Sequence, residues 1–230
     1  MSWKSGVTTA LVTPLQEDGA VDLTSFRRLV QDQIHGQVSG IVLWGSTGEG
    51  PLLTQREKFV LLETARDVLR SVGTPPQLIL NVGGSSTHEM VQLCTQINPD
   101  HYDAMMVVIP PYVKPPIEGL IAHLQAVREF HKPLMLYHIP GRTGRRLSPQ
   151  EMQQLLSACP HITAVKESSG DLEMLSFLTQ QALRGGPTPT RYVGDDPLYL
   201  EALQKNLAVG VVSVISNAIP GTWQSLSPQD

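Results

Sequence analysis

The chain has 230 residues, enough for one large domain with a hydrophobic core. Hydrophobic residues make up 41% of it and charged residues 17%, and the formal net charge of -4 is not gathered into acidic or basic blocks. This composition is ordinary for a globular protein, and no apolar run reaches the roughly 20 residues that cross a bilayer. We therefore expect no nucleic-acid partner and no membrane partner.

The cysteines and the amino terminus favour a cytoplasmic protein. Cys94 and Cys159 lie far apart and neither belongs to a metal-spaced pair, so reduced, buried thiols are the simplest interpretation. Residues 1–6 lack the apolar centre of a signal peptide. No group of His, Asp and Glu has the spacing of a metal site, so we expect no metal.

Segments typical of strands and helices alternate along the chain. Apolar runs predict strands, and runs with helical spacing, several of them opened by Ser, Thr or Asp, predict helices. Thr54 with Glu57 and Ser148 with Glu151 have the spacing of a capping box. The expected strands are 6–12, 40–44, 77–82, 103–109, 134–137, 161–166, 191–193 and 209–214, and the expected helices are 22–38, 54–69, 87–97, 117–130, 148–157, 171–182 and 196–206.

Eight strands alternating with helices predict an α/β fold, a (β/α)8 TIM barrel, as a single domain over residues 1–230. A doubly wound sheet is the alternative. It normally has a glycine-rich turn after its first strand, whereas this strand ends in Val12-Thr13-Pro14. Nine residues follow Gly221, too few for a full last helix, so we expect that the sequence stops short of its natural end.

A (β/α)8 barrel has its active site at the carboxyl ends of its strands. Lys166 ends the apolar run 162–165, at such a position. Desolvation in an apolar pocket lowers an amine's pKa, and the neutral amine can attack a ketone to form a Schiff base. The alternative interpretation is a solvated lysine that ends a surface strand.

The loops after other strands carry further candidates. Ser46 and Thr47 lie on a glycine-rich turn whose hydroxyl and N–H groups suit a small carboxylate, although a plain turn before a helix fits equally well. Tyr137 ends a strand and could relay protons to a neighbouring lysine. Arg142 offers a planar fork that binds carboxylates.

Together and in this order, these segments resemble the pyruvate-dependent aldolase family of Schiff-base (β/α)8 barrels, which includes dihydrodipicolinate synthase and N-acetylneuraminate lyase. The resemblance covers about residues 6–220. It is closest to dihydrodipicolinate synthase, because residues 137–144, YHIPGRTG, look like that enzyme's tyrosine-to-arginine segment. It implies condensation of pyruvate with L-aspartate 4-semialdehyde to 4-hydroxy-tetrahydrodipicolinate, in lysine and diaminopimelate biosynthesis.

The resemblance implies a role for each candidate. Lys166 would form the Schiff base with pyruvate, and Tyr137 would be the general acid and base beside it. Ser46 would supply the relay hydroxyl where the synthase usually has threonine. Thr47 would bind the pyruvate carboxylate and Arg142 that of the second substrate. The remaining residues expected around the substrates are Tyr112, Gly194 and the backbone of Val212. No cofactor is implied beyond the covalent Schiff base.

Some positions depart from the family. It usually has two adjacent tyrosines after the fourth strand, the second of which reaches into a neighbouring subunit's site. Here Tyr112 is taken as the first, and Val113, which cannot pass a proton, occupies the second place. His138 replaces the usual asparagine. The family's helical carboxyl-terminal region is largely absent from this sequence.

Alternatives to the synthase remain at this point. One is a related aldolase or lyase that acts on another 2-keto acid, such as N-acetylneuraminate lyase or a 2-keto-3-deoxy sugar acid aldolase. Another is a catalytically silent relative that only binds a small metabolite. The family implies a homotetramer or homodimer.

The resemblance also leads to an expectation about feedback inhibition, since many dihydrodipicolinate synthases are inhibited by lysine bound beside the active site. The matching positions here hold Lys58, Ser85, Glu89 and Tyr112. Lys58 adds a positive charge where a cationic amino acid must bind. We therefore expect weak or absent inhibition by lysine.

Overall fold

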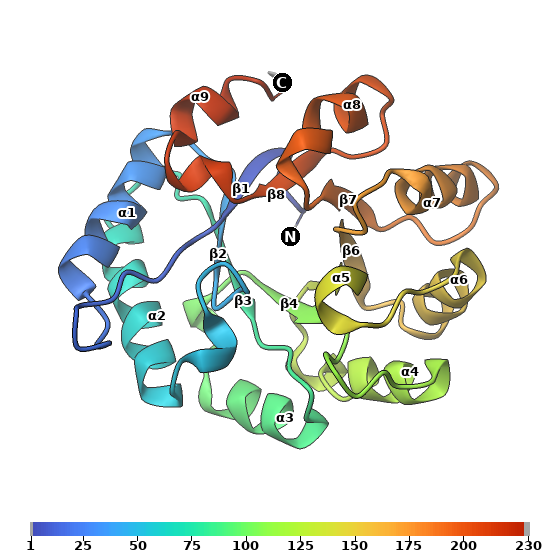
Figure 1. Ribbon diagram of the computed structural model, residues 1–230, viewed down its shortest axis with the longest axis horizontal. Helices are drawn as coiled ribbons and strands as arrows, with labels where there is room; N and C mark the ends of the chain where they lie inside the picture. The colour runs from blue at the N-terminus through green and yellow to red at the C-terminus, as the bar shows by residue number, and fades with distance from the viewer. Residues whose placement is uncertain (1, 228–230) are drawn as a thin grey trace.

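The computed structural model describes residues 2–227. Eight parallel strands form a closed barrel in the order in which they occur in the chain, with β8 pairing to β1 (Figure 1). The predicted (β/α)8 barrel is confirmed. The strands are β1 (Gly6–Ala10), β2 (Gly40–Leu43), β3 (Gln77–Asn81), β4 (Ala104–Val108), β5 (Leu134–His138), β6 (Ile162–Glu167), β7 (Thr190–Val193) and β8 (Gly210–Ser213).

Helices surround the barrel, as Figure 1 shows in a view along its axis. The α-helices are α1 (Leu23–His35), α2 (Gln55–Leu69), α3 (Thr87–Gln96), α4 (Ile117–Gln125), α5 (Pro140–Thr143), α6 (Pro149–Ala158), α7 (Glu173–Leu183), α8 (Tyr199–Gln204) and α9 (Pro220–Gln224). Short 3₁₀ turns add η1 (Gly50–Leu52), η2 (Pro99–His101), η3 (Arg128–Phe130), η4 (Asp196–Leu198) and η5 (Ile215–Asn217). Both predicted capping boxes are present, at the starts of α2 and α6.

The helices of the structure differ from the expected ones in several places. The predicted helix 117–130 is α-helical only as far as Gln125 and continues as the 3₁₀ turn η3. The predicted helix 196–206 begins as a 3₁₀ turn that contains Pro197, a residue without a backbone N–H to donate. The four-residue helix α5, inside the segment 137–144, was not predicted.

Alternation along the strands separates two sets of buried side chains. One set fills the inside of the barrel: Ala10, Val42, Ile79, Ala104, Met106, Met135, Tyr137, Ala164, Tyr192 and Val212. The larger set lies between the strands and the surrounding helices and includes Leu136 and Val165. The inner set is apolar, so polar side chains that face the inside of the barrel are exceptions. Where such side chains lie near the carboxyl ends of the strands, they indicate the candidate site.

Candidate active site

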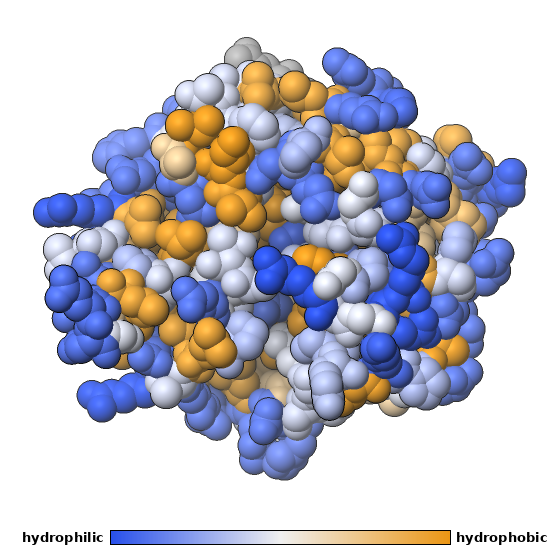
Figure 2. Space-filling view, viewed as in Figure 1, coloured by the Kyte–Doolittle hydropathy of each residue, from blue (hydrophilic) through white to orange (hydrophobic). Residues whose placement is uncertain are grey.

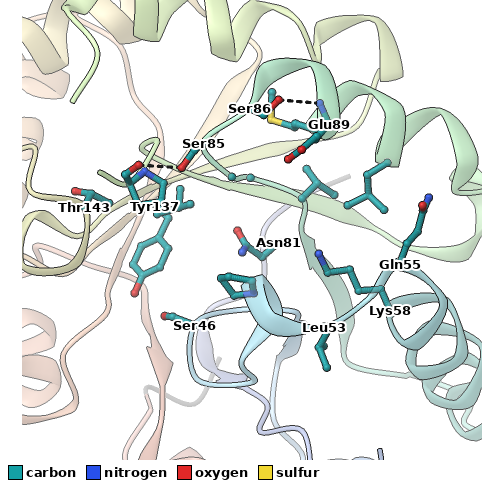
Figure 3. A pocket seen from close by; sticks show the side chains of 18 of the residues that line it. Ser46, Leu53, Gln55, Lys58, Asn81, Ser85, Ser86, Glu89, Tyr137 and Thr143 are labelled. Carbon is teal, nitrogen blue, oxygen red and sulfur yellow. Dashed lines mark hydrogen bonds between the residues drawn. The ribbon is translucent and has the colours of Figure 1, made fainter. Parts of the chain in front are cut away.

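A cavity of about 710 Å³ opens at the carboxyl ends of β2 to β5 (Figure 3). Ser46, Asn81 and Tyr137 line its inner part, and Arg142 lines it from α5. The sequence analysis named three of these four residues; Asn81 was missed. The sequence signal was available, since Asn81 is an amide at the end of an apolar strand. Its Oδ1 atom is buried without a hydrogen-bond partner among residues 2–227.

Lys166 lies directly against Tyr137. The two residues face each other in the register between β5 and β6, and Lys166 is only 4% exposed. Its Nζ atom lies 4.0 Å from the centre of the Tyr137 ring. The face of an aromatic ring attracts a cationic group, and this contact places no acidic side chain against the lysine nitrogen. No salt bridge joins Lys166 to any other residue of the described chain, 2–227.

The turn after β2 presents Ser46 through a strained backbone. Trp44 and Glu49 both have positive φ angles, 61° and 55°. A Cβ atom at Gly50 would lie 1.8 Å from the Trp44 carbonyl oxygen, so only glycine fits where the chain folds back on itself. Strained backbone of this kind concentrates at binding sites. Thr47 is half-buried on the same turn but does not line the cavity.

Gly194 lies beside Lys166, as the sequence analysis expected. A Cβ atom at Gly194 would lie 2.8 Å from Lys166 Cε, so a larger residue would displace the lysine. Val212 is fully buried in the inner cluster with Tyr137 and is not part of the cavity wall. The structure thus gathers Lys166, Tyr137 and Gly194 at one place.

Tyr112 is not brought to this site within its own chain. Its side chain is 91% exposed and does not line the cavity. Its φ angle of 70° is in the left-handed region, which disfavours a bulky residue. Its backbone N–H donates to the Thr143 carbonyl oxygen, 3.2 Å away, which fixes the loop beside α5 while the ring points outward.

His138 and Glu167 form a fully buried pair behind the site. The His138 Nδ1 atom lies 2.8 Å from Glu167 Oε2, and both side chains are 0% exposed. The backbone N–H of Leu147 donates to His138 Nε2, 3.1 Å away. His138 Nε2 is therefore an acceptor, and Nδ1 carries the proton that it donates to the carboxylate. Alternation places the pair on the outer side of the barrel, opposite to Lys166 and Tyr137.

The outer part of the cavity extends between α2 and α3. Lys58, Ser85 and Glu89 line it together (Figure 3), whereas Tyr112, the fourth residue of the group that the resemblance implies, does not. Burial lowers the pKa of Lys58, and the nearby Glu89 carboxylate acts in the opposite direction. A cationic and an anionic side chain therefore share this chamber.

Two further observations apply to the described part of the chain as a whole. Among residues 2–227, no three His, Cys, Asp or Glu side chains come together in a metal-binding group. No helix in this part of the chain is long and apolar enough to cross a membrane.

This geometry, an inward lysine held on a tyrosine ring at the mouth of a (β/α)8 barrel, defines the class of Schiff-base barrels. Comparison with known proteins identifies the family. The family described as "Dihydrodipicolinate synthetase family" matches residues 4–229. The chain therefore belongs to this family, and it is a lyase of the class I aldolase type whose Schiff base to a lysine needs no cofactor.

Individual relatives agree with this assignment. The 4-hydroxy-tetrahydrodipicolinate synthase of Parasynechococcus marenigrum is 39% identical over 215 residues, which cover 93% of this chain and 68% of the relative. The dihydrodipicolinate synthase of Cyanidioschyzon merolae, solved with lysine bound, has a TM-score of 0.85 and 34% identity over 96% of this chain and 73% of that one. The chloride-inhibited enzyme of Acinetobacter baumannii, complexed with pyruvate, has a TM-score of 0.85 and 33% identity over 96% and 74%.

Proposed function

We propose that this protein condenses pyruvate with L-aspartate 4-semialdehyde to give 4-hydroxy-tetrahydrodipicolinate, a step of lysine and diaminopimelate biosynthesis. The observation that carries the proposal is the buried Lys166 amine, 4.0 Å from the Tyr137 ring centre at the carboxyl end of β6. Relatives with the name of this synthase are 34–40% identical to the chain.

Lys166 attacks the keto carbon of pyruvate, and loss of water leaves the Schiff base. Tyr137 is the general acid and base for these proton transfers, since its ring lies on the amine and its side chain also lines the cavity. Ser46 lines the same cavity and can pass a proton to or from the Tyr137 hydroxyl through its own hydroxyl. Thr47, on the same turn, is proposed to bind the pyruvate carboxylate.

Arg142 is proposed to bind the carboxylate of the semialdehyde. It lies on the wall of the cavity and carries no salt bridge to another residue of the described chain, so its fork is available. This residue is also the reason to prefer the synthase over N-acetylneuraminate lyase, because the lyase lacks an arginine in the segment that the chain resembles.

Borohydride reduction in the presence of pyruvate tests the chemistry directly. Reduction of the Schiff base should add the mass of the reduced pyruvate adduct to one peptide, the one that contains Lys166. Lys166→Arg should abolish this labelling, whereas Lys205→Arg, a control at the residue that follows α8, should keep it. Label on another lysine, or none, would refute the proposed Schiff base. Consumption of L-aspartate 4-semialdehyde by the unlabelled enzyme then separates the synthase from its relatives.

We also propose that the protein forms a homodimer or homotetramer. Apolar side chains are exposed on both sides of the cavity mouth: Leu52 (78%), which follows Pro51 of the cavity wall, and Tyr112 (91%) with Val113 (54%), which follow Pro111. The space-filling view has hydrophobic groups at the position of η1 (Figure 2). In a monomer nothing would compensate the strain and the exposure of Tyr112, whereas a second copy of the chain would cover its side chain.

The molar mass of the protein in solution tests the proposed oligomer directly. Light scattering should give a multiple of the 25.1 kDa chain mass, and Tyr112→Asp should shift the mass toward that of the single chain. Leu183→Asp, which changes an exposed leucine at the far end of α7, serves as the control and should leave the mass unchanged. A monomer in both cases would contradict the proposal. We further propose a cytoplasmic location, which agrees with two free, buried cysteines.

A further inference from the structure

Ser168 lies beside the candidate catalytic lysine with an unused hydroxyl. The residue follows β6 directly and is 7% exposed. Its Oγ atom has no hydrogen-bond partner among residues 2–227. Burying a hydroxyl without a hydrogen bond costs about 1–3 kcal/mol, so native proteins supply a partner from water or a ligand where the chain provides none. The sequence analysis did not select this residue.

Strand alternation makes Ser168 face the inside of the barrel. Ala164 belongs to the inner cluster, and side chains two residues apart along a strand point to the same side. The Ser168 N–H donates to the His138 carbonyl oxygen, 2.9 Å away, which continues the pairing of β6 with β5 by one residue. Lys166 and Ser168 therefore both point inward, and Ser168 is one step closer to the mouth.

The absence of a side chain at Gly194 creates the space that the two residues share. A Cβ atom there would lie 1.8 Å from Ser168 Oγ and 2.8 Å from Lys166 Cε. The same Cβ position is therefore close to both side chains, so the Ser168 hydroxyl and the end of the Lys166 side chain are neighbours. The Gly194 N–H donates to the Glu167 carbonyl oxygen, 2.7 Å away, which holds this corner in place.

We propose that the Ser168 hydroxyl binds the carbonyl oxygen of the second, aldehyde substrate and so helps to determine which aldehyde reacts. This inference rests on the proposed function. A keto acid joined to the Lys166 amine occupies the space next to that amine. The aldehyde must then arrive from the mouth, where Ser168 lies.

The hydrogen bond has its largest effect during carbon–carbon bond formation. The carbon nucleophile derived from pyruvate attacks the aldehyde carbon, and the electron pair of the C=O π bond moves onto the aldehyde oxygen. That oxygen then takes a proton from water and becomes a hydroxyl. A donor already placed beside it stabilises the charge that develops there. Ser168 makes and breaks no covalent bond in this role.

Ser168→Ala isolates the contribution of the hydroxyl. The change removes one atom without a partner in the chain, so the melting temperature should be maintained. We expect kcat/KM for L-aspartate 4-semialdehyde to fall about 10- to 100-fold, while the rate of borohydride trapping of pyruvate on Lys166 stays unchanged. Ser169→Ala is the matched control, because the Ser169 hydroxyl donates to Asp171 Oδ1, 3.3 Å away, and both rates should remain normal.

The outcomes separate this inference from the proposed function. Unchanged kcat/KM in Ser168→Ala would overturn the inference. Slower trapping of pyruvate in that variant would also overturn it, because the hydroxyl would then serve the first substrate. Failure of the unaltered enzyme to trap pyruvate would refute the proposed function itself, before any variant is measured.

Discussion

At the scale of single residues, the buried pair His138–Glu167 supports the site from behind. Each residue directly follows a candidate catalytic residue in the sequence, Tyr137 or Lys166, and the two pairs are adjacent in the register of β5 and β6. Through Leu147 the pair also holds the end of the loop that carries Arg142. Removing one partner would leave the other polar group buried without compensation.

We therefore predict that His138→Leu lowers the free energy of unfolding by about 3–5 kcal/mol, as measured by chemical denaturation. The double variant His138→Leu with Glu167→Leu should recover much of this loss, because no buried charge remains. Isotope-edited NMR of the unaltered protein should show a proton on Nδ1 of His138 and none on Nε2. A loss below about 1 kcal/mol in the single variant would contradict this account of the pair.

At the scale of secondary-structure elements, the space between α2 and α3 is the feature on which our prediction about lysine inhibition depends. Lys58 on α2 and Glu89 on α3 line the same cavity as Ser46 and Tyr137 (Figure 3). The lowered pKa of Lys58 indicates that burial already disfavours one ammonium group in this chamber. A second ammonium, from free lysine, would add repulsion on the order of 1–4 kcal/mol.

We predict that lysine inhibits this enzyme weakly, with half-inhibition above about 1 mM. Lys58→Gln removes the charge and should strengthen inhibition roughly tenfold or more, because about 1.4 kcal/mol corresponds to a factor of ten in affinity. The control Lys205→Gln, which removes the same charge at the residue after α8, should have no effect. Inhibition of the unaltered enzyme well below a millimolar would show that the chamber tolerates two ammonium groups.

At the scale of the whole molecule, the closed barrel explains why residues distant in sequence form one site. The strands are parallel, so the ends that carry Ser46, Asn81, Tyr137, Lys166 and Gly194 all meet at one mouth. The same face carries exposed apolar groups over the segment from Val214 to Ile219, between β8 and α9 (Figure 2). The mouth of the barrel thus carries the candidate active site, and exposed apolar groups lie on the same face of the molecule.

The sequence by itself determined the alternation of strands and helices, and from it the barrel. Hydrophobic periodicity and capping residues such as Thr54 and Ser148 are local signals, so they are readable without coordinates. The positions of Lys166 and Tyr137 at strand ends followed in the same way. The helix α5 was not readable, because its four residues are too few to show a period.

Only the tertiary structure decided which side chains meet. Gly194 and Ser168 are 26 positions apart in the sequence, and their contact depends on the register of β6 with β7. The exposure of Tyr112 and the pairing of His138 with Glu167 depend equally on the packing of separate strands and loops. The physical reason is that hydrogen bonding and burial at these positions come from residues distant in the chain, and a local pattern carries no record of them.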